Sequence, residues 1–180
     1  MLTLTFKAAK REGACKESYR KFARFKGGVN KWGEDKPFPL LEVLEHNGLD
    51  DALWALECCE PIEERDRIAR LFICDCAERV LHLFEEKFPD DKRPRQAIEV
   101  ARRFAIGQAT IEELRDAREA AWAAWEAGAA AWEAAEAAGA AWEAGEAAEA
   151  AGAAREAAWG AAREAEREWQ KEQLRRYLKD

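Results

Sequence analysis

The chain has 180 residues and a formal net charge of −7, from 36 acidic and 29 basic side chains. This balance argues against a generic duplex-DNA-binding protein, because such proteins gather a net basic surface. No uncharged apolar run approaches the roughly 18 residues of a membrane span, and the start lacks the apolar stretch of a secretory signal. Five cysteines, an odd number, are typical of reduced thiols and predict a cytoplasmic protein.

Charge is distributed unevenly along the chain. Residues 1–31 hold nine basic and two acidic side chains, a balance of +7, whereas residues 32–110 and 111–180 each carry −7. A basic start followed by an acidic remainder favours attraction between the two, within one chain or between chains.

The first part of the chain has the pattern of several short helices. Apolar residues recur at helical spacing in short runs, and glycine or proline ends each run. The pattern predicts a helix from about residue 15 to Gly27-Gly28, a loop over 29–39, and helices over 40–48 and 49–59, the last of which ends before Pro61.

Residues 62–88 form the best candidate for a core helix. Seven apolar side chains keep helical spacing there until Pro89, namely Ile68, Leu71, Phe72, Cys76, Val80, Leu83 and Phe84. Another helix is expected from about Pro94 to Gly107. Only LTLTF at the start hints at a strand, so the predicted fold class is all-α.

The chain changes character after residue 109. Thr110 and Glu113 have the spacing of a capping box, in which each side chain binds the other's backbone N–H. Of the 49 residues from 120 to 168, 26 are alanine. We therefore expect a compact helical domain over 1–109, with a basic first helix. We expect a long Ala/Trp/Glu-rich helix, a helical hairpin or an oligomer-forming segment over 110–180.

A tryptophan–glutamate stripe is the most unusual feature of this second part. The tetrad Ala-Trp-Glu-Ala occurs three times, at 124–127, 131–134 and 141–144. One interpretation is a recognition surface for a protein partner. The other is structural: the tryptophans fill grooves between alanine-rich helices of one chain or of a homo-oligomer. The candidate partner-binding residues are Trp125, Trp132, Trp142, Glu126, Glu133 and Glu143.

The basic first helix provides a second candidate surface. Lys16, Arg20 and Arg24 alternate with aromatic residues, as in some proteins that bind single-stranded nucleic acid. We favour an amphipathic helix whose aromatic side chains enter the core while its basic face meets the acidic body. Nucleic acid is therefore an unlikely partner, and the three cations are assigned to protein binding.

No residue pattern indicates catalysis or a bound cofactor. Cys58-Cys59, Cys74 and Cys76 with His46 or His82 offer ligand types for zinc. Cys74 and Cys76, however, lie two apart on a predicted helix and point in nearly opposite directions, which favours buried thiols. Asp50-Asp51 are expected to cap a helix. The sequence holds no nucleophile-elbow, phosphate-loop or HExxH motif, so we predict no enzyme, no metal and no cofactor.

The stretch from Asn47 to about Glu119 resembles an immunity protein family of bacterial polymorphic-toxin gene clusters, which also occurs in phage genomes. The resemblance rests on NGLDDALWAL (47–56), RLFICDCAERVLHLFE (70–85) and RPRQAIEVARRFAIGQATIEELRDARE (93–119). An Ala/Trp-rich tract such as 120–132 often follows in the family. The resemblance implies a compact helical protein that neutralises a cognate toxin by occlusion, without a cofactor, and it supplies no site residues. The basic first helix and the very long tail depart from the family pattern.

The leading hypothesis is thus a non-enzymatic, protein-binding inhibitor of the immunity type. One alternative is a phage-encoded inhibitor that binds a host defence protein. Another is a structural protein that self-assembles through the alanine-rich segment.

Overall fold

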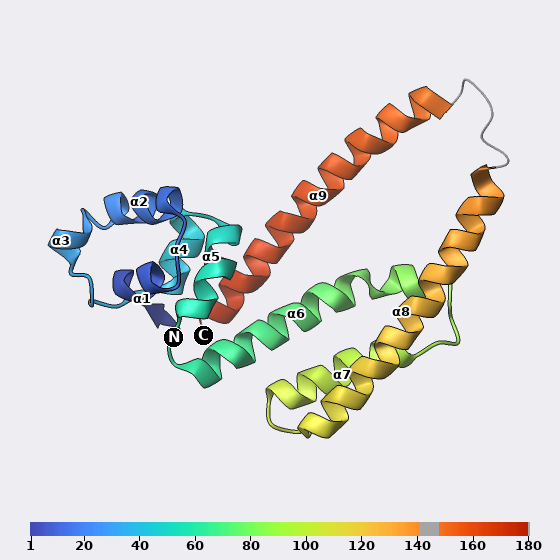
Figure 1. The fold of residues 1–180 in the computed structure, drawn as a ribbon, viewed down its shortest axis with the longest axis horizontal. Helices are drawn as coiled ribbons and strands as arrows, with labels where there is room; N and C mark the ends of the chain where they lie inside the picture. The colour runs from blue at the N-terminus through green and yellow to red at the C-terminus, as the bar shows by residue number, and fades with distance from the viewer. Residues whose placement is uncertain (141–147, 180) are drawn as a thin grey trace. The chain divides into compact units, whose positions relative to one another are not determined.

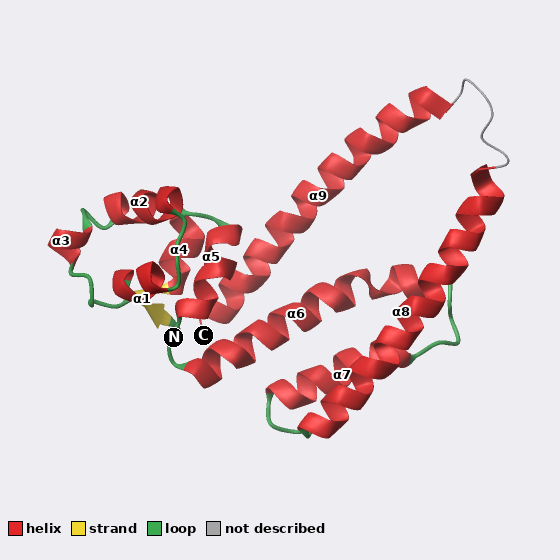
Figure 2. Cartoon of the chain, in the orientation of Figure 1, coloured by secondary structure: helices red, strands yellow, loops and turns green. Residues whose placement is uncertain are grey.

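The computed structural model describes residues 1–140 and 148–179, with side chains described except at positions 125, 127–140 and 148–162. Helices dominate these residues, and two short strands form the sheet that accompanies them, so the all-α prediction is confirmed (Figures 1 and 2). The α-helices are α1 (Phe6–Arg11), α2 (Lys16–Phe25), α3 (Val29–Trp32), α4 (Leu40–His46), α5 (Leu49–Ala55), α6 (Ile62–Glu85), α7 (Arg93–Ala105), α8 (Ile111–Ala140) and α9 (Ala148–Lys179). A 3-10 turn, η1 (Leu56–Cys58), follows α5, and the strands are β1 (Thr3–Leu4) and β2 (Phe38–Pro39).

The chain divides into two compact units, Met1–Phe72 with Arg167–Asp180, and Ile73–Glu166. We call these the first and the second unit and describe each by itself. The boundary predicted between residues 109 and 110 stays a prediction.

The first unit is built around aromatic side chains. Phe6, Phe22 and Phe38 are buried, and their ring centroids lie 4.8 to 6.0 Å apart. Strand β1 pairs antiparallel with β2, with Leu4 opposite Phe38. Because a short strand gains little by itself, burial of Leu4 and Phe38 on this core holds the pair together.

The end of α9 also belongs to the first unit. Leu174 and Leu178 are buried there, and Arg175 binds Glu45 of α4 through two hydrogen bonds of 2.5 and 3.1 Å. Arg167 forms an ion pair with Asp50 of α5. The two ends of the described chain therefore lie in the same unit (Figure 1).

The second unit contains the end of α6, together with α7, α8 and α9 up to Glu166. Helices α7 and α8 pack along one another after a turn at Gly107, whose φ of +74° suits glycine. The predicted capping box is confirmed: the Thr110 N–H donates to Glu113 at 2.7 Å, and the Glu113 N–H donates to Thr110 Oγ1 at 3.1 Å. Arg102 of α7 holds α6 through Asp75 at 2.6 Å and Glu78 at 2.5 Å.

Several local expectations need correction. The expected loop over 29–39 contains the one-turn helix α3 and strand β2. Gly48, rather than Asp50 or Asp51, is the N-cap of α5, and the two aspartates lie in its first turn. The helix predicted over 49–59 ends at Ala55 and is followed by η1.

The side chains predicted to form the core face of α6 are buried only in part. Ile68 and Phe72 are buried, but Val80 and Leu83 are exposed. Helical spacing identifies side chains on a common face, yet it does not supply a neighbour to cover that face.

Candidate partner-binding site

An apolar groove of about 670 Å³ runs between α6, α7 and α8 in the second unit. Its α6 wall carries an apolar stripe at the helical spacing i, i+4, i+7 and i+11. Pro94, alanine side chains and Ile98 line it from α7, and the first half of α8 completes the lining with Leu114, Arg118, Ala121 and Trp122. The residues that define this groove are Ile73, Ala77, Val80, Phe84, Ile98, Leu114 and Trp122.

Large side chains in the groove remain open to solvent. Exposed fractions are 64% for Ile73, 48% for Val80 and 60% for Trp122. Within the described part of the second unit, the buried apolar side chains are Cys74, Leu81 and Ala124. A contiguous apolar surface of this kind marks a site for protein interaction, since burying it in a partner releases it from water.

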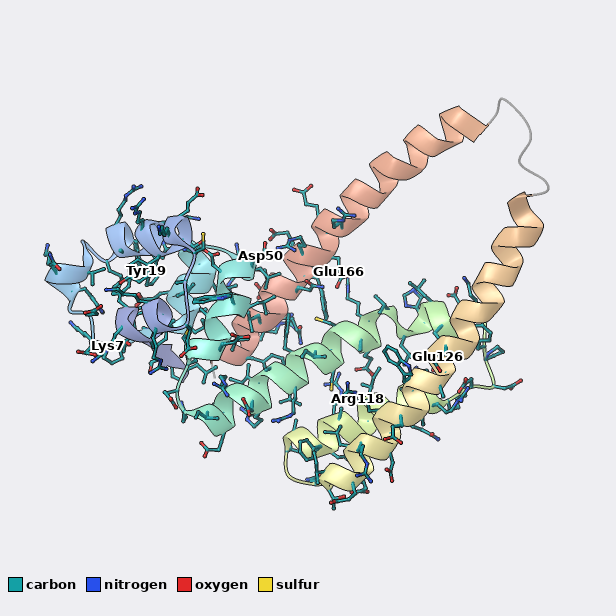
Figure 3. The ribbon with its side chains drawn as sticks, viewed as in Figure 1. Lys7, Tyr19, Asp50, Arg118, Glu126 and Glu166 are labelled. Carbon is teal, nitrogen blue, oxygen red and sulfur yellow. The ribbon has the colours of Figure 1, made fainter. Side chains whose placement is uncertain are left out.

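The groove has a rigid frame and a polar rim. The Arg102 bonds to α6 fix the spacing of α6 and α7, and the capping box fixes the start of α8. At the rim, the Trp122 Nε1–H donates to Glu126 at 3.1 Å, which orients the exposed indole ring. Arg118 and Glu126 both lie on α8 at this rim (Figure 3). The frame is thus suited to presenting apolar side chains to a macromolecular partner.

The structure describes only part of the predicted tryptophan–glutamate stripe. Glu126 is exposed and accepts the hydrogen bond from Trp122. Trp125, Trp132 and Glu133 belong to α8, but their side chains are not described, and Trp142 with Glu143 lies outside the described residues. Their role in binding stays a prediction.

The predicted basic surface lies in the first unit. Lys16, Arg20 and Arg24 are exposed along one side of α2, and none forms an ion pair with a described residue. The expected contact between this basic face and the acidic body stays a prediction. Of the aromatic residues, Phe22 is buried as expected, whereas Phe25 is exposed and stacks on His46 with centroids 3.4 Å apart.

The cysteines behave as separate thiols. Cys58, Cys59 and Cys74 are buried, and burial raises the pKa of the Cys59 thiol to about 12. In residues 1–140 and 148–179, no group of three or more His, Cys, Asp or Glu side chains is placed to hold a metal ion. Over the same ranges, no helix has both the length and the hydropathy required to cross a bilayer.

Sequence reasoning missed the groove, although part of its signal was present. The groove shares Val80 and Phe84 with the predicted core face of α6, whereas Ile73, Ala77 and the small residues of α7 belong to no predicted site. The groove exists because no other element covers this face of α6 in the described structure. Helical spacing in the sequence does not show whether a distant element will cover a given face.

An open apolar groove on a helical frame is typical of proteins that bind other proteins. The chain matches a family model described as "Imm-5 like putative immunity protein" over residues 60–177. It therefore belongs to this immunity protein family. The match includes the whole groove and most of the alanine-rich part, so the long tail lies within the family region, whereas residues 1–59 lie outside it. No curated protein and no solved structure matches the chain.

Proposed function

We propose that this chain is a cytoplasmic inhibitor that neutralises a protein toxin or effector by binding and occluding it, without catalysis. One observation carries the proposal: the open apolar groove of α6, α7 and α8 lies within the part of the chain that defines the immunity family. A partner that inserts apolar side chains beside Val80 and Trp122 would bury the exposed surface and gain the corresponding hydrophobic free energy.

The first experiment co-expresses the chain with the product of the neighbouring gene. The proposal expects restored growth and a stable complex on size-exclusion chromatography. If the neighbouring gene product gives neither restored growth nor a complex, that product is not the target of this chain.

A matched pair of variants tests the surface. Val80 lines the groove and Leu83 does not, yet both are exposed on α6, three residues apart. Val80→Asp places a charge in the apolar interface and is expected to weaken binding roughly 30-fold, the equivalent of about 2 kcal/mol at an interface centre. Leu83→Asp should leave binding nearly unchanged. Equal losses in the two variants, measured by calorimetry, would contradict the assignment of the groove.

Self-association would cover the same groove with a second copy. Sedimentation at several protein concentrations separates the two cases, since an inhibitor of this type is expected to keep a constant mass when alone. Growth of the particles with concentration, abolished by Val80→Asp, would favour assembly instead.

A further inference from the structure

A second cavity, of about 350 Å³, lies in the first unit, between α1, α2, β2 and α5. Phe6, Tyr19, Phe22, Phe38 and Trp54 give it aromatic walls. The volume is within the range that holds small organic ligands. All its lining residues fall between Leu4 and Ala55, outside the family match, so the cavity is distinct from the groove on which the proposed function rests.

One end of this pocket is a positioned carboxylate. Asp51 accepts a hydrogen bond from Ser18 Oγ at 2.9 Å and another from Asn47 Nδ2 at 2.7 Å. The same Asn47 amide donates to the Ser18 backbone oxygen at 2.9 Å, so both of its N–H groups are engaged and the side-chain orientation follows. Asp51 is thereby held in place by neutral donors.

The described residues give this carboxylate no cationic partner. Among the described residues Asp51 forms no ion pair, whereas the neighbouring Asp50, which is labelled in Figure 3, pairs with Arg167. Lys21 donates to the Asn47 backbone oxygen at 3.3 Å and does not line the pocket. The pocket lining includes two acidic side chains and no basic one. A carboxylate beside aromatic rings attracts an ammonium group, through charge and through the faces of the rings.

The same unit already holds an ammonium group in this way. Lys26 binds Glu42 at 2.5 Å, and its Nζ lies 3.6 Å from the centroid of Trp32 and 5.8 Å from that of Phe38. Phe38 also lines the pocket. The pocket therefore combines a carboxylate with aromatic rings, as the site of Lys26 does, and Asp51 corresponds to Glu42. The pocket lining itself contains no lysine.

We propose that this pocket binds a small aromatic amine, with the ammonium group on Asp51 and the apolar body against Phe6, Tyr19 and Phe38. A neutral compound of the same shape would gain the apolar contacts without the ion pair. An anionic one would be repelled by both aspartates.

Calorimetry on the full chain with 2-phenylethylamine tests this proposal, with 2-phenylethanol as the neutral comparison. A dissociation constant on the order of 1 mM or tighter is expected for the amine, as for a small ligand in a preformed pocket. The alcohol is expected to bind at least about tenfold more weakly, because it lacks the charge-assisted hydrogen bond.

Three variants locate the site. Asp51→Asn should lower the affinity for the amine by about tenfold and change the affinity for the alcohol by less than about twofold. Ala14→Phe, which fills the pocket from its lining, should abolish binding of both. Asp35→Asn, an exposed aspartate outside the pocket, is the matched control and should leave both affinities unchanged.

A chemical readout maps the ligand independently. Cys15 lines the pocket and is exposed, so bound amine should slow its alkylation by iodoacetamide and leave Cys76 of the second unit unaffected. Absence of amine binding, equal binding of the alcohol, or unchanged affinity in Asp51→Asn would overturn the proposal. Tighter, Asp51-dependent binding of Nα-acetyl-lysine amide would also overturn it, and would assign the pocket to a lysine of a protein partner.

Discussion

Lys26 shows how a single charged residue can belong to a core. Its side chain is only 6% exposed, yet it has a carboxylate partner in Glu42 and an aromatic face in Trp32. Burial of an ammonium group is costly unless such partners replace the water that it loses. Lys36 lies over the same Trp32 ring at 4.1 Å but is exposed.

This difference predicts unequal effects of the same substitution. Lys26→Met should lower the free energy of unfolding of the first unit by about 2 kcal/mol, because it leaves Glu42 without its cation and removes the contact with Trp32. Lys36→Met is the matched control and should cost little. Hydrogen exchange of amides in the first unit, measured at increasing urea concentrations, gives the free energy of unfolding of each variant. Equal losses of stability in the two variants would contradict the argument.

Cys15 differs from the other thiols in its expected reactivity. The backbone N–H groups of Ser18 and Glu17, at the start of α2, lower the pKa of the Cys15 thiol, whereas burial raises the pKa of Cys58, Cys59, Cys74 and Cys76. Since the thiolate is the nucleophile, Cys15 should be alkylated first near neutral pH, with a half-maximal rate at a lower pH than for free cysteine. Mass spectrometry over a pH series would show the order, and faster labelling of Cys76 would refute it.

At the scale of an element, α8 depends on its cap. Thr110 and Glu113 satisfy each other's backbone N–H at the exposed start of the helix. Thr110→Ala should therefore cost about 1 kcal/mol of helix stability. Thr110→Ser retains the hydroxyl group and is expected to cost far less. Hydrogen exchange of the first turn of α8 reports the difference directly.

The basic stripe of α2 should act on the rate of association rather than on stability. Lys16, Arg20 and Arg24 are exposed and unpaired in the described structure, so neutralising them breaks no internal contact. The triple change to glutamine is expected to slow binding of an acidic partner several-fold, with the greatest effect at low salt.

A charge-matched control exists on α1. Lys7, Lys10 and Arg11 also carry three positive charges, but each is paired with a carboxylate of its own unit. Their triple change to glutamine alters the net charge equally and should affect association less. Identical rates for the two triple variants would assign the effect to net charge alone.

Elements with strong local signals could be predicted from the sequence, and burial could not. The end of α2 at two glycines and the start of α8 at the capping box could be predicted, because both depend on the local chemistry of the backbone. Helix α1 was missed because its six residues are stabilised by burial of Phe6 and Ala9 on distant parts of the chain. The groove and the pocket were missed for a related reason: a cavity forms where non-neighbouring elements fail to fill the space between them.

For the molecule as a whole, the end of α9 stabilises the first unit from far along the chain, with Arg175 and Glu45 separated by 130 positions. Leu174 is completely buried there. Leu174→Ala should lower the stability of the first unit by about 3 kcal/mol, since it removes buried methyl groups and leaves a cavity. Glu168→Ala, at an exposed position of the same helix, is the control. The rate of amide hydrogen exchange in α4 and α5 should rise only in the Leu174→Ala variant.

The ion pair between Arg175 and Glu45 makes this long-range attachment dependent on pH. The Arg175 guanidinium lowers the pKa of Glu45 in the folded chain, so the folded state binds a proton less readily than the unfolded state. The stabilisation is complete above the unfolded pKa of about 4.3 and is lost as the pH falls through the lower folded value.

Glu45→Gln should consequently reduce the steepness with which the first unit loses stability on acidification. Arg175→Gln should have the same effect, because either change removes the coupling. Glu64 has its pKa lowered by Arg67 in the same unit, so some acid sensitivity should persist in both variants. Unfolding free energies between about pH 6 and pH 3 would measure the difference, and an unchanged slope in both variants would show that the pair does not couple protonation to the attachment of α9.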